Sequence, residues 1–370
     1  MKVLMQIREN YLTGPGGDTI QLLKTKEYLE KIGVEADVST ELEPDLSSYD
    51  LVHLFNLTRI QETFIQAKNA KKQGKRIALS TIYWPFDEMN NAGYSGLRQL
   101  VYRCLPSDRI ENAKALYKYL FKGERNKGCR ALILGTYSKM QKWVIDNCDI
   151  CLPNAKREMV KIDEYLHTKK EYIVVPNAID MAAVHSALEY TGDEFNQYKD
   201  FIVCVARISR RKNQMLLVNA VKGTNYKLLF VGKSSPGELD YYKQFVMAIR
   251  NNPNIEYIES LPNSELYKLY KVCRVSVLPS WFETPGLVSL EAGAMGCNIV
   301  ITDKGTTRDY FGDMAYYFDL TEDSLRAQLE KAYFEPRRKD LQKKILANYT
   351  WEEAAKKTLE GYLIALKQKN

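Results

Sequence analysis

Two glutamates, Glu283 and Glu291, lie eight positions apart in the stretch of the sequence that carries the most chemical information. Short apolar runs precede and follow this stretch, so we expect a helix between two strands. Pro285 and Gly286 favour a turn just before that helix, which leaves its first backbone N–H groups available to an anion. An unpaired carboxylate among the small residues around Glu291 would be costly. Glu291 therefore accepts hydrogen bonds, either from a ligand hydroxyl or, as a structural group, from the backbone or an arginine.

A second set of candidate residues follows the apolar run 201–206. Arg207 comes directly after this run, and Lys212 lies five positions later, before a predicted helix. Ligands of doubly wound α/β domains bind at the carboxyl ends of the strands, where two cations could hold a diphosphate. A charged loop is often only a solvated surface, so both interpretations stay open at this point.

A glycine-rich turn at residues 14–18 follows the first apolar run and opens a helix. Gly16 and Gly17 allow a ligand to approach the backbone closely, and the N–H groups at the helix start favour an anion. The dinucleotide fingerprint requires a third glycine, but residue 19 is threonine, which disfavours NAD and FAD. The alternative is a plain strand-to-helix turn with Asp18 as the N-cap.

The elements that position these residues follow a βαβ pattern, with short apolar runs separated by amphipathic segments. Strands are expected at 2–7, 34–38, 51–55, 76–81, 149–152 and 172–175, and then at 201–206, 227–231, 255–258, 275–278 and 298–302. This alternation predicts parallel sheets covered by helices on both faces. The fold class is therefore α/β, with two Rossmann-like doubly wound domains that face each other across a cleft.

The domain boundaries follow from where this pattern stops and restarts. We expect an N-terminal domain over 1–180 and a polar linker over 181–199. A C-terminal domain would follow over 200–350, and a helix over 351–370 would pack back toward the first domain.

The motifs, in their order along the chain, resemble those of family 4 of the GT-B glycosyltransferases, the retaining, nucleotide-sugar-dependent class. The E-x7-E motif of that family corresponds to Glu283 and Glu291, and its Arg-x4-Lys pair to Arg207 and Lys212. Three further motifs of the family match residues 279–287 (PS-x2-E-x2-G-L), 291–296 (E-A-x-A-x-G) and 176–180 (PN-x-ID). The resemblance is strong over about 170–320 and looser in the first domain.

The resemblance implies that the N-terminal domain (1–180) binds the acceptor and that the C-terminal domain (200–350) binds the donor. It also implies a role for each matched residue. Arg207 and Lys212 would bind the donor diphosphate and stabilise the negative charge that develops as it leaves. Glu291 would bind the ribose hydroxyls, and Glu283 would contact the transferring sugar. Backbone N–H groups in the segment after Glu283 would hold sugar and phosphate, which makes this segment the rest of the donor site: Thr284, Pro285, Gly286 and Leu287.

Retention in this family is described as front-face attack, in which the leaving phosphate accepts the proton of the acceptor. No protein nucleophile is then required, and none is evident in the sequence. Aspartates never occur as D-x-D, which weakens a metal-dependent GT-A alternative. We expect no metal and no cofactor, with a UDP- or GDP-linked sugar as substrate.

The first domain departs from the family pattern. Many relatives carry a histidine in the first-domain cleft after the fourth strand, where this chain has Ser-Thr-Ile-Tyr-Trp at 80–84. We expect Tyr83 of this segment to line the acceptor side of the cleft together with Gly16, Gly17 and Asp18. His53 ends an earlier strand and is interpreted as a packed or capping histidine. In the second domain, Pro285 replaces the usual phenylalanine of E-x-F-G.

The net charge of +7, from 53 basic and 46 acidic residues, is unevenly distributed. Eleven lysines and arginines against three acids give the segment 98–142 a charge of +8. Apolar residues at helical spacing form one stripe within 110–121, and Lys114, Lys118 and Lys122 recur on another face. Three interpretations remain, namely a solvated helix face, contact with an anionic lipid surface or acceptor, and a less favoured nucleic-acid patch. We expect no nucleic-acid partner.

Several classes of protein are disfavoured by composition. No apolar stretch approaches the roughly 20 residues that a transmembrane helix needs. The N-terminal run meets Arg8 before the apolar core of a signal peptide could form. Seven cysteines without such a signal indicate reduced thiols, and for Cys148 and Cys151 we favour buried thiols over a redox pair or half a zinc site. We expect a cytoplasmic protein, with peripheral binding to the inner face of the membrane under the lipid interpretation.

The sequence therefore predicts a retaining, metal-independent glycosyltransferase that moves a hexosyl unit from a UDP- or GDP-sugar. The acceptor would be a glycan or lipid-linked glycan, in bacterial surface polysaccharide biosynthesis. Two alternatives remain, a nucleotide-sugar epimerase of GT-B fold and a non-catalytic sugar-nucleotide-binding subunit. The epimerase would convert its donor without any acceptor.

Overall fold

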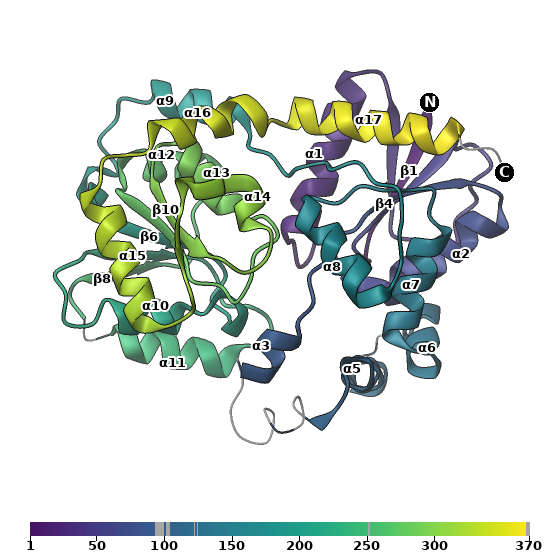
Figure 1. The fold of residues 1–370 in the computed structure, drawn as a ribbon, viewed down its shortest axis with the longest axis horizontal. Coiled ribbons are helices and arrows are strands. Elements are labelled where there is room, and N and C mark those ends of the chain that lie inside the picture. Colours follow the sequence, from purple (N-terminus) through teal and green to yellow (C-terminus); the bar gives the residue numbers. More distant parts are fainter. Residues whose placement is uncertain (93–99, 101–103, 122, 124, 251, 368–370) are drawn as a thin grey trace. The chain divides into compact units, whose positions relative to one another are not determined.

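The chain folds into two compact units, which Figure 1 shows in a computed structural model. The structure describes residues 1–92, 100, 104–121, 123, 125–250 and 252–367. Unit 1 comprises Met1–Asn177 and Trp351–Asn370, and unit 2 comprises Ala178–Thr350. Four charged residues of the predicted basic segment lie outside the described residues: Arg98, Arg103, Lys122 and Glu124.

Unit 1 is built on a parallel sheet whose described strands follow the order β2-β1-β3-β4-β5. The strands β1, β3 and β4 are almost continuous apolar runs because helices cover both faces of the sheet. The bounds of the strands are β1 (Lys2–Gln6), β2 (Glu35–Ser39), β3 (Leu51–Phe55), β4 (Arg76–Ser80) and β5 (Ile150–Cys151).

The helices of unit 1 form two layers around this sheet. The helices α2 (Ile60–Lys72), α7 (Tyr137–Asn147) and α8 (Lys156–Leu166) enclose a hydrophobic cluster on one face. On the other face, α17 (Trp351–Lys367) contacts α1 (Gly17–Lys31), β4 and β5, so the C-terminal helix belongs to unit 1. The remaining described helices of this unit are the short 3-10 helix η1 (Leu57–Arg59), α3 (Asp87–Ala92), α5 (Ser107–Phe121) and α6 (Lys127–Leu134).

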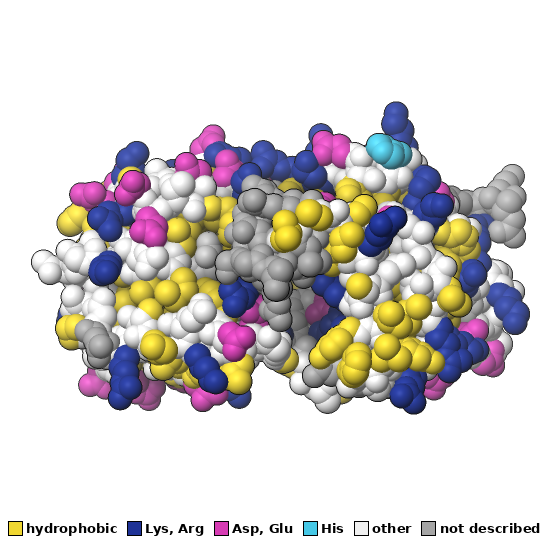
Figure 2. Space-filling view, turned by 90° about the horizontal axis from the view of Figure 1, so that it is seen from below, with side chains coloured by type: hydrophobic (Ala, Val, Ile, Leu, Met, Phe, Trp, Pro, Cys, Tyr) yellow, Lys and Arg dark blue, Asp and Glu magenta, His cyan; other side chains and the backbone are white. Residues whose placement is uncertain are grey.

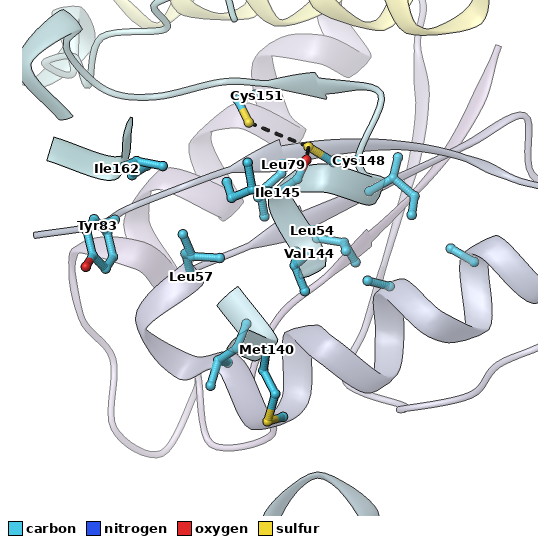
Figure 3. Close-up of a cluster of buried hydrophobic side chains, with 14 of the residues drawn as sticks. Leu54, Leu57, Leu79, Tyr83, Met140, Val144, Ile145, Cys148, Cys151 and Ile162 are labelled. Carbon is cyan, nitrogen blue, oxygen red and sulfur yellow. Dashed lines mark hydrogen bonds between the residues drawn. The ribbon is translucent and has the colours of Figure 1, made fainter. Parts of the chain in front are cut away.

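Figure 3 shows the hydrophobic cluster of unit 1, in which Leu54 and Leu79 of the sheet meet Val144 of α7. The thiols of Cys148 and Cys151 lie in this cluster with their Sγ atoms 3.5 Å apart, and both residues are buried. The hydrogen bond with Cys148 and burial raise the pKa of the Cys151 thiol well above its ordinary value. The interpretation of these cysteines as buried thiols is confirmed.

Unit 2 repeats the architecture with a parallel sheet in the order β11-β10-β9-β6-β7-β8. Its strands are β6 (Ile202–Val205), β7 (Leu228–Val231), β8 (Ile255–Ile258), β9 (Val275–Leu278), β10 (Asn298–Thr302) and β11 (Tyr316–Phe318). Its α-helices are α9 (Met181–Glu189), α10 (Gln214–Ala220), α11 (Leu239–Ile249), α12 (Asn263–Val272), α13 (Leu287–Ala294), α14 (Thr307–Phe311), α15 (Glu322–Phe334) and α16 (Lys339–Asn348). Short 3-10 turns complete it: η2 (Asn196–Tyr198), η3 (Arg210–Lys212) and η4 (Gly312–Met314). The α/β class with two Rossmann-like domains is therefore confirmed.

The predicted polar linker over 181–199 is wrong, because this segment belongs to the body of unit 2. It contains α9, whose Asp180 N-cap accepts hydrogen bonds from two backbone N–H groups at the helix start. Val184 and Ala187 of α9 are buried, and Lys271 of α12 donates to three backbone carbonyls at the end of α9. These contacts hold the segment against the rest of unit 2. Its polar composition gives no sign of them.

The predicted strand at 172–175 is reduced to an isolated bridge between Cys151 and Tyr172. The segment still runs along β5, because Ile173 and Val175 donate to the carbonyls of Cys151 and Pro153. β5 itself is only two residues long, so it offers too short a partner for a full strand.

Candidate active site

Three loops at the carboxyl end of the unit 2 sheet bring the candidate residues together. The loop after β6 carries Lys212, the loop after β9 carries Glu283, and the loop after β10 carries Gly305. Backbone hydrogen bonds join the last two loops, because Glu283 N–H donates to Lys304 (3.2 Å) and Thr306 N–H donates to Glu283 (2.8 Å). Since β6, β9 and β10 are neighbours, the sheet order itself places these loops side by side.

Gly305 lets the two loops approach each other. Its φ of +97° lies in the left-handed region, and a Cβ atom there would stand 2.0 Å from the carbonyl oxygen of Glu283. Glycine is therefore required, both for the backbone conformation and for the space. The sequence analysis did not single out Gly305, because no local motif marks a contact between residues that are 22 positions apart.

Glu283 is buried and ion-paired. Its Oε1 lies 2.5 Å from Nζ of Lys212 and 3.5 Å from Nη1 of Arg211. Burial alone would raise the pKa of Glu283, but the charges of Lys212 and Arg211 outweigh it and hold the pKa below its ordinary value. The carboxylate is therefore ionised at neutral pH, as the centre of a small charged cluster.

Arg211 is the residue of this cluster that the sequence analysis missed. Its guanidinium group lies 5.5 Å from the centre of the Phe282 ring and donates to the Phe282 carbonyl (3.2 Å). Its own carbonyl accepts a hydrogen bond from Trp281 N–H (3.0 Å). The predicted cation Arg207 is an exposed residue at the start of the same loop. The order of the cations along the loop does not indicate that Arg211 pairs with Glu283.

The helix α13 begins as predicted, directly after Gly286. This N-cap glycine has a φ of +79°, and its carbonyl accepts from the N–H groups of Ser289 and Leu290. Within the described residues, the N–H groups of Gly286, Leu287 and Val288 donate to no protein atom. The start of α13, next to Thr284 and Pro285, thus presents several backbone donors and the positive end of a helix dipole.

Two buried hydroxyl groups lie in the segments around this turn. Ser289 on α13 and Thr306 after β10 are fully buried, and their hydroxyl oxygens have no partner among the described residues. Buried polar atoms normally have a partner, so a bound ligand or water can be accommodated here.

Glu291 lies on α13, eight residues after Glu283 in the chain, in a different environment. It is half-buried, and its recorded partner is the side-chain amide of Asn263, which donates to Oε1 at 3.4 Å. Burial raises the pKa of Glu291 to about 7. No arginine pairs with this carboxylate in the described part of the chain, so it retains capacity to accept further hydrogen bonds.

The glycine-rich turn of unit 1 is held by an ion pair that the sequence analysis did not anticipate. Gly16, not Asp18, is the N-cap of α1, and Gly17 is its first residue. Asp18 is buried and accepts from Arg8 Nε (2.6 Å) and Nη2 (3.0 Å). Arg8 also donates to Gly14 O (3.0 Å). Burial alone would raise the pKa of Asp18, but the hydrogen bond and charge of Arg8 lower it. The N-cap interpretation of Asp18 is wrong, because its carboxylate is engaged by Arg8.

Tyr83, predicted to line the cleft, lies in the hydrophobic cluster with 2% of its surface exposed (Figure 3). Its backbone N–H donates to the buried carboxylate of Glu158 (2.8 Å), which also accepts from the Thr81 hydroxyl. Between them, Ile82 adopts a φ of +43°, an unfavourable conformation for a β-branched residue. Ile82 and Trp84, on either side of the buried Tyr83, are half-buried.

His53 occupies the interior of unit 1. Its Nδ1 lies 2.7 Å from the Tyr362 hydroxyl and its Nε2 lies 2.9 Å from the Ser80 hydroxyl. Burial lowers its pKa to about 3, so the ring is neutral. The interpretation of His53 as a packed histidine is confirmed.

Most of unit 2 matches a known family model. Residues 192–346 match the model of the family described as glycosyl transferases group 1. Among the described residues, no group of three or more histidines, cysteines, aspartates or glutamates is arranged to hold a metal ion.

The chain is also similar to curated proteins over part of its length. It is 25% identical over 178 residues to an uncharacterised glycosyltransferase of Methanocaldococcus jannaschii, which is 45% of either chain. It is 23% identical over 208 residues to a probable sucrose-phosphate synthase of Thermosipho melanesiensis, which is 54% of this chain and 48% of that protein. The matches thus span about half the length of these relatives.

Solved structures resemble the whole chain. Sucrose-phosphate synthase from Thermosynechococcus elongatus superposes with a TM-score of 0.71 at 13% identity, over 98% of both chains. Anabaena HepE in complex with UDP and glucose gives a TM-score of 0.68 at 13% identity, over 98% of this chain and 99% of that one. Such likeness establishes the fold. The chain therefore has the GT-B fold, and its residues 192–346 match the glycosyl transferases group 1 family.

Proposed function

We propose that this protein is a retaining, metal-independent glycosyltransferase that transfers a hexosyl unit from a UDP- or GDP-sugar to a glycan acceptor. The observation that carries the proposal is the ion-paired cluster of buried Glu283 with Lys212 and Arg211, next to the start of α13 within the matched residues. A role in bacterial surface polysaccharide biosynthesis, on a free or lipid-linked glycan, is the finer form of the proposal.

The charges of the site suit a nucleoside diphosphate leaving group. Lys212, Arg211 and the unpaired N–H groups of Gly286 and Leu287 all favour an anion. As the bond from the anomeric carbon to the phosphate breaks, negative charge grows on the phosphate oxygen. These donors stabilise that charge without having to reorganise, which lowers the barrier. Arg207 would join them on the exposed side of the site.

The carboxylate of Glu283 would contact the sugar that is transferred. Because Lys212 and Arg211 keep it ionised, it can accept hydrogen bonds from sugar hydroxyls and favour the positive charge of an oxocarbenium-like state. Thr284, Pro285, Gly286 and Leu287 would shape the pocket for the sugar and its phosphate. Glu291, weakly engaged by Asn263, would bind the two ribose hydroxyls.

The reaction would then need no protein nucleophile. The acceptor hydroxyl attacks the face of the sugar from which the phosphate departs, and the departing phosphate oxygen takes its proton. The configuration at the anomeric carbon is retained. In unit 1, Gly16 and Gly17 would contact the acceptor, with Asp18 fixing their turn through Arg8.

The test is a transfer assay with a panel of UDP- and GDP-hexoses and glycan acceptors. The rate is measured from the nucleotide that is released. We expect Glu283→Gln to lower the rate by about a hundredfold or more, because the substitution removes the charge that the site is built around. The matched control is Glu330→Gln, the same change at an exposed position on α15, which should leave the rate unchanged.

Two outcomes would contradict the proposal. Wild-type rates in a folded Glu283→Gln variant would refute the role of Glu283. Conversion of the donor to an epimer in the absence of any acceptor would favour the epimerase, and donor binding without any turnover would favour a binding subunit.

A further inference from the structure

Helix α5 of unit 1 carries large hydrophobic side chains that face solvent. The sequence predicts an apolar stripe on this helix, and such stripes normally pack against a core. In the structure, Ile110 and Ala115 are the residues of α5 that are buried. Four larger residues are between 43% and 72% exposed, and we call them the α5 apolar face: Leu116, Tyr117, Leu120 and Phe121.

These residues form one continuous surface. At about 100° per residue, the α5 apolar face occupies an arc of about 140° around the helix. The rings of Tyr117 and Phe121 lie 5.2 Å apart, as expected for neighbours one turn apart. Figure 2, which views the molecule from the side on which α5 lies in Figure 1, shows hydrophobic side chains gathered there among lysines and arginines. A contiguous exposed apolar surface of this kind marks an interaction site.

Basic residues border the α5 apolar face on both sides. By helical position, Lys114 and Lys118 lie next to one edge of the arc, where Lys114 is also ion-paired with Glu111 (2.7 Å). Beyond the other edge lies Tyr119, whose ring stands 6.0 Å from the guanidinium of Arg125 and 5.9 Å from that of Arg130. The arrangement is therefore an apolar strip between two basic margins.

We propose that the α5 apolar face and its basic margins dock unit 1 on the surface of a membrane that contains anionic phospholipids. The hydrophobic side chains enter the boundary between head groups and acyl chains, and the basic side chains contact the phosphates. Tyr117 and Phe121 suit this boundary, because aromatic side chains concentrate at membrane interfaces. Among the described residues no helix is long and apolar enough to cross a bilayer, so α5 would lie in the plane of the interface.

The basic margins favour an anionic lipid surface over a second copy of the chain as the partner of the α5 apolar face. Two copies that met through this face would bring their basic margins together, and like charges oppose such contact. An anionic lipid surface complements both margins at once. The inference goes beyond the proposed function and does not depend on it, because vesicle binding is measured without any nucleotide sugar.

The test is co-sedimentation of the full chain with vesicles of phosphatidylcholine alone and with vesicles that also contain phosphatidylglycerol. We expect binding to the mixed vesicles and at least about tenfold weaker binding of the Leu116→Ser/Leu120→Ser variant. Removing a basic side chain, as in Lys118→Gln, should weaken binding about fivefold, and added salt should weaken it further.

Matched controls come from unit 2. Leu188 and Leu239 are 45% and 58% exposed, close to the exposure of Leu116 and Leu120. The Leu188→Ser/Leu239→Ser variant should therefore bind vesicles as the wild type does, as should Lys243→Gln. Thermal unfolding would verify that all variants are folded, which their surface positions favour.

Three results would overturn the inference. One is equal binding to neutral and anionic vesicles, or none to either. Another is unchanged binding of the Leu116→Ser/Leu120→Ser variant. The third is a lipid-free dimer in light scattering that this variant dissociates, which would assign the face to a second copy. If nucleotide sugars bind and turn over while vesicles do not, this inference fails and the proposed function stands.

Discussion

The two glutamates of the E-x7-E motif differ in their surroundings, and the difference assigns them different chemistry. Glu283 lies against two cations, which hold its pKa below the ordinary value. Glu291 has the neutral amide of Asn263 as its recorded partner, and burial raises its pKa to about 7. One carboxylate is thus ionised at any pH near neutral, whereas the other changes its protonation in that range.

This contrast predicts a pH dependence of donor binding. In the proposed site, ionised Glu291 would accept hydrogen bonds from ribose hydroxyls, so donor binding would lower its pKa. Near pH 7 and below, binding would therefore release a proton from Glu291. Affinity should therefore be high above pH 7 and fall below it, with the Kd rising about tenfold between pH 8 and pH 6. Isothermal titration with a nucleotide sugar, whose diphosphate does not titrate in this range, measures the effect.

The control is Glu291→Gln, which cannot ionise and should bind with a Kd that does not vary over this range. A wild-type Kd that is equally flat would show that Glu291 does not contact the donor in its ionised form.

At the scale of elements, the site depends on how closely the loops after β9 and β10 approach each other. The bridge between Glu283 and Gly305 fixes the backbone that carries the catalytic candidate. The same loops carry the buried hydroxyl of Thr306, so a shift of one loop would displace several groups of the site.

Gly305→Ala should therefore unfold more easily and lose donor affinity. The new Cβ would overlap the Glu283 carbonyl at 2.0 Å, and the φ of +97° is unfavourable for alanine. We expect a loss of about 3 kcal/mol in the free energy of unfolding, measured by urea denaturation. Gly223→Ala is the matched control, since Gly223 has a φ of +75° but nothing within 4 Å of its Cβ position, and it should lose about 1 kcal/mol. Equal losses in both variants would show that the loop contact is unimportant.

The elements around the donor candidates could be predicted because strong local signals mark them. The proline and glycine before α13 set its start, and apolar runs set β6, β9 and β10. The contacts that could not be predicted are non-local. The Arg8–Asp18 pair, the inward orientation of Arg211 and the closeness of Gly305 to Glu283 all join residues whose sequence neighbours carry no sign of the contact. The helix in 181–199 was missed because its burial depends on Lys271 and other residues of α12.

At the scale of the whole molecule, the features behind the two proposals lie in different units. The predicted donor residues all lie in unit 2, and the exposed apolar and basic surface of α5 lies in unit 1. The positive charge of the segment 98–142 is therefore separated along the chain from the proposed nucleotide site. The sequence could predict this separation from counts, but not that the apolar stripe of α5 remains exposed, because exposure depends on what the rest of the chain covers.

The central claim is that unit 2 holds a nucleotide-sugar site built around Lys212 and Glu283. The most direct test is a thermal-shift panel of UDP, GDP, ADP and their sugars, with the wild type and a Lys212→Gln variant. UDP or GDP and the corresponding sugars should stabilise the wild type, by about 2.7 kcal/mol at a hundredfold excess over Kd, and should stabilise the variant much less. If no nucleotide stabilises the wild type, or if the variant responds equally, the claim is contradicted.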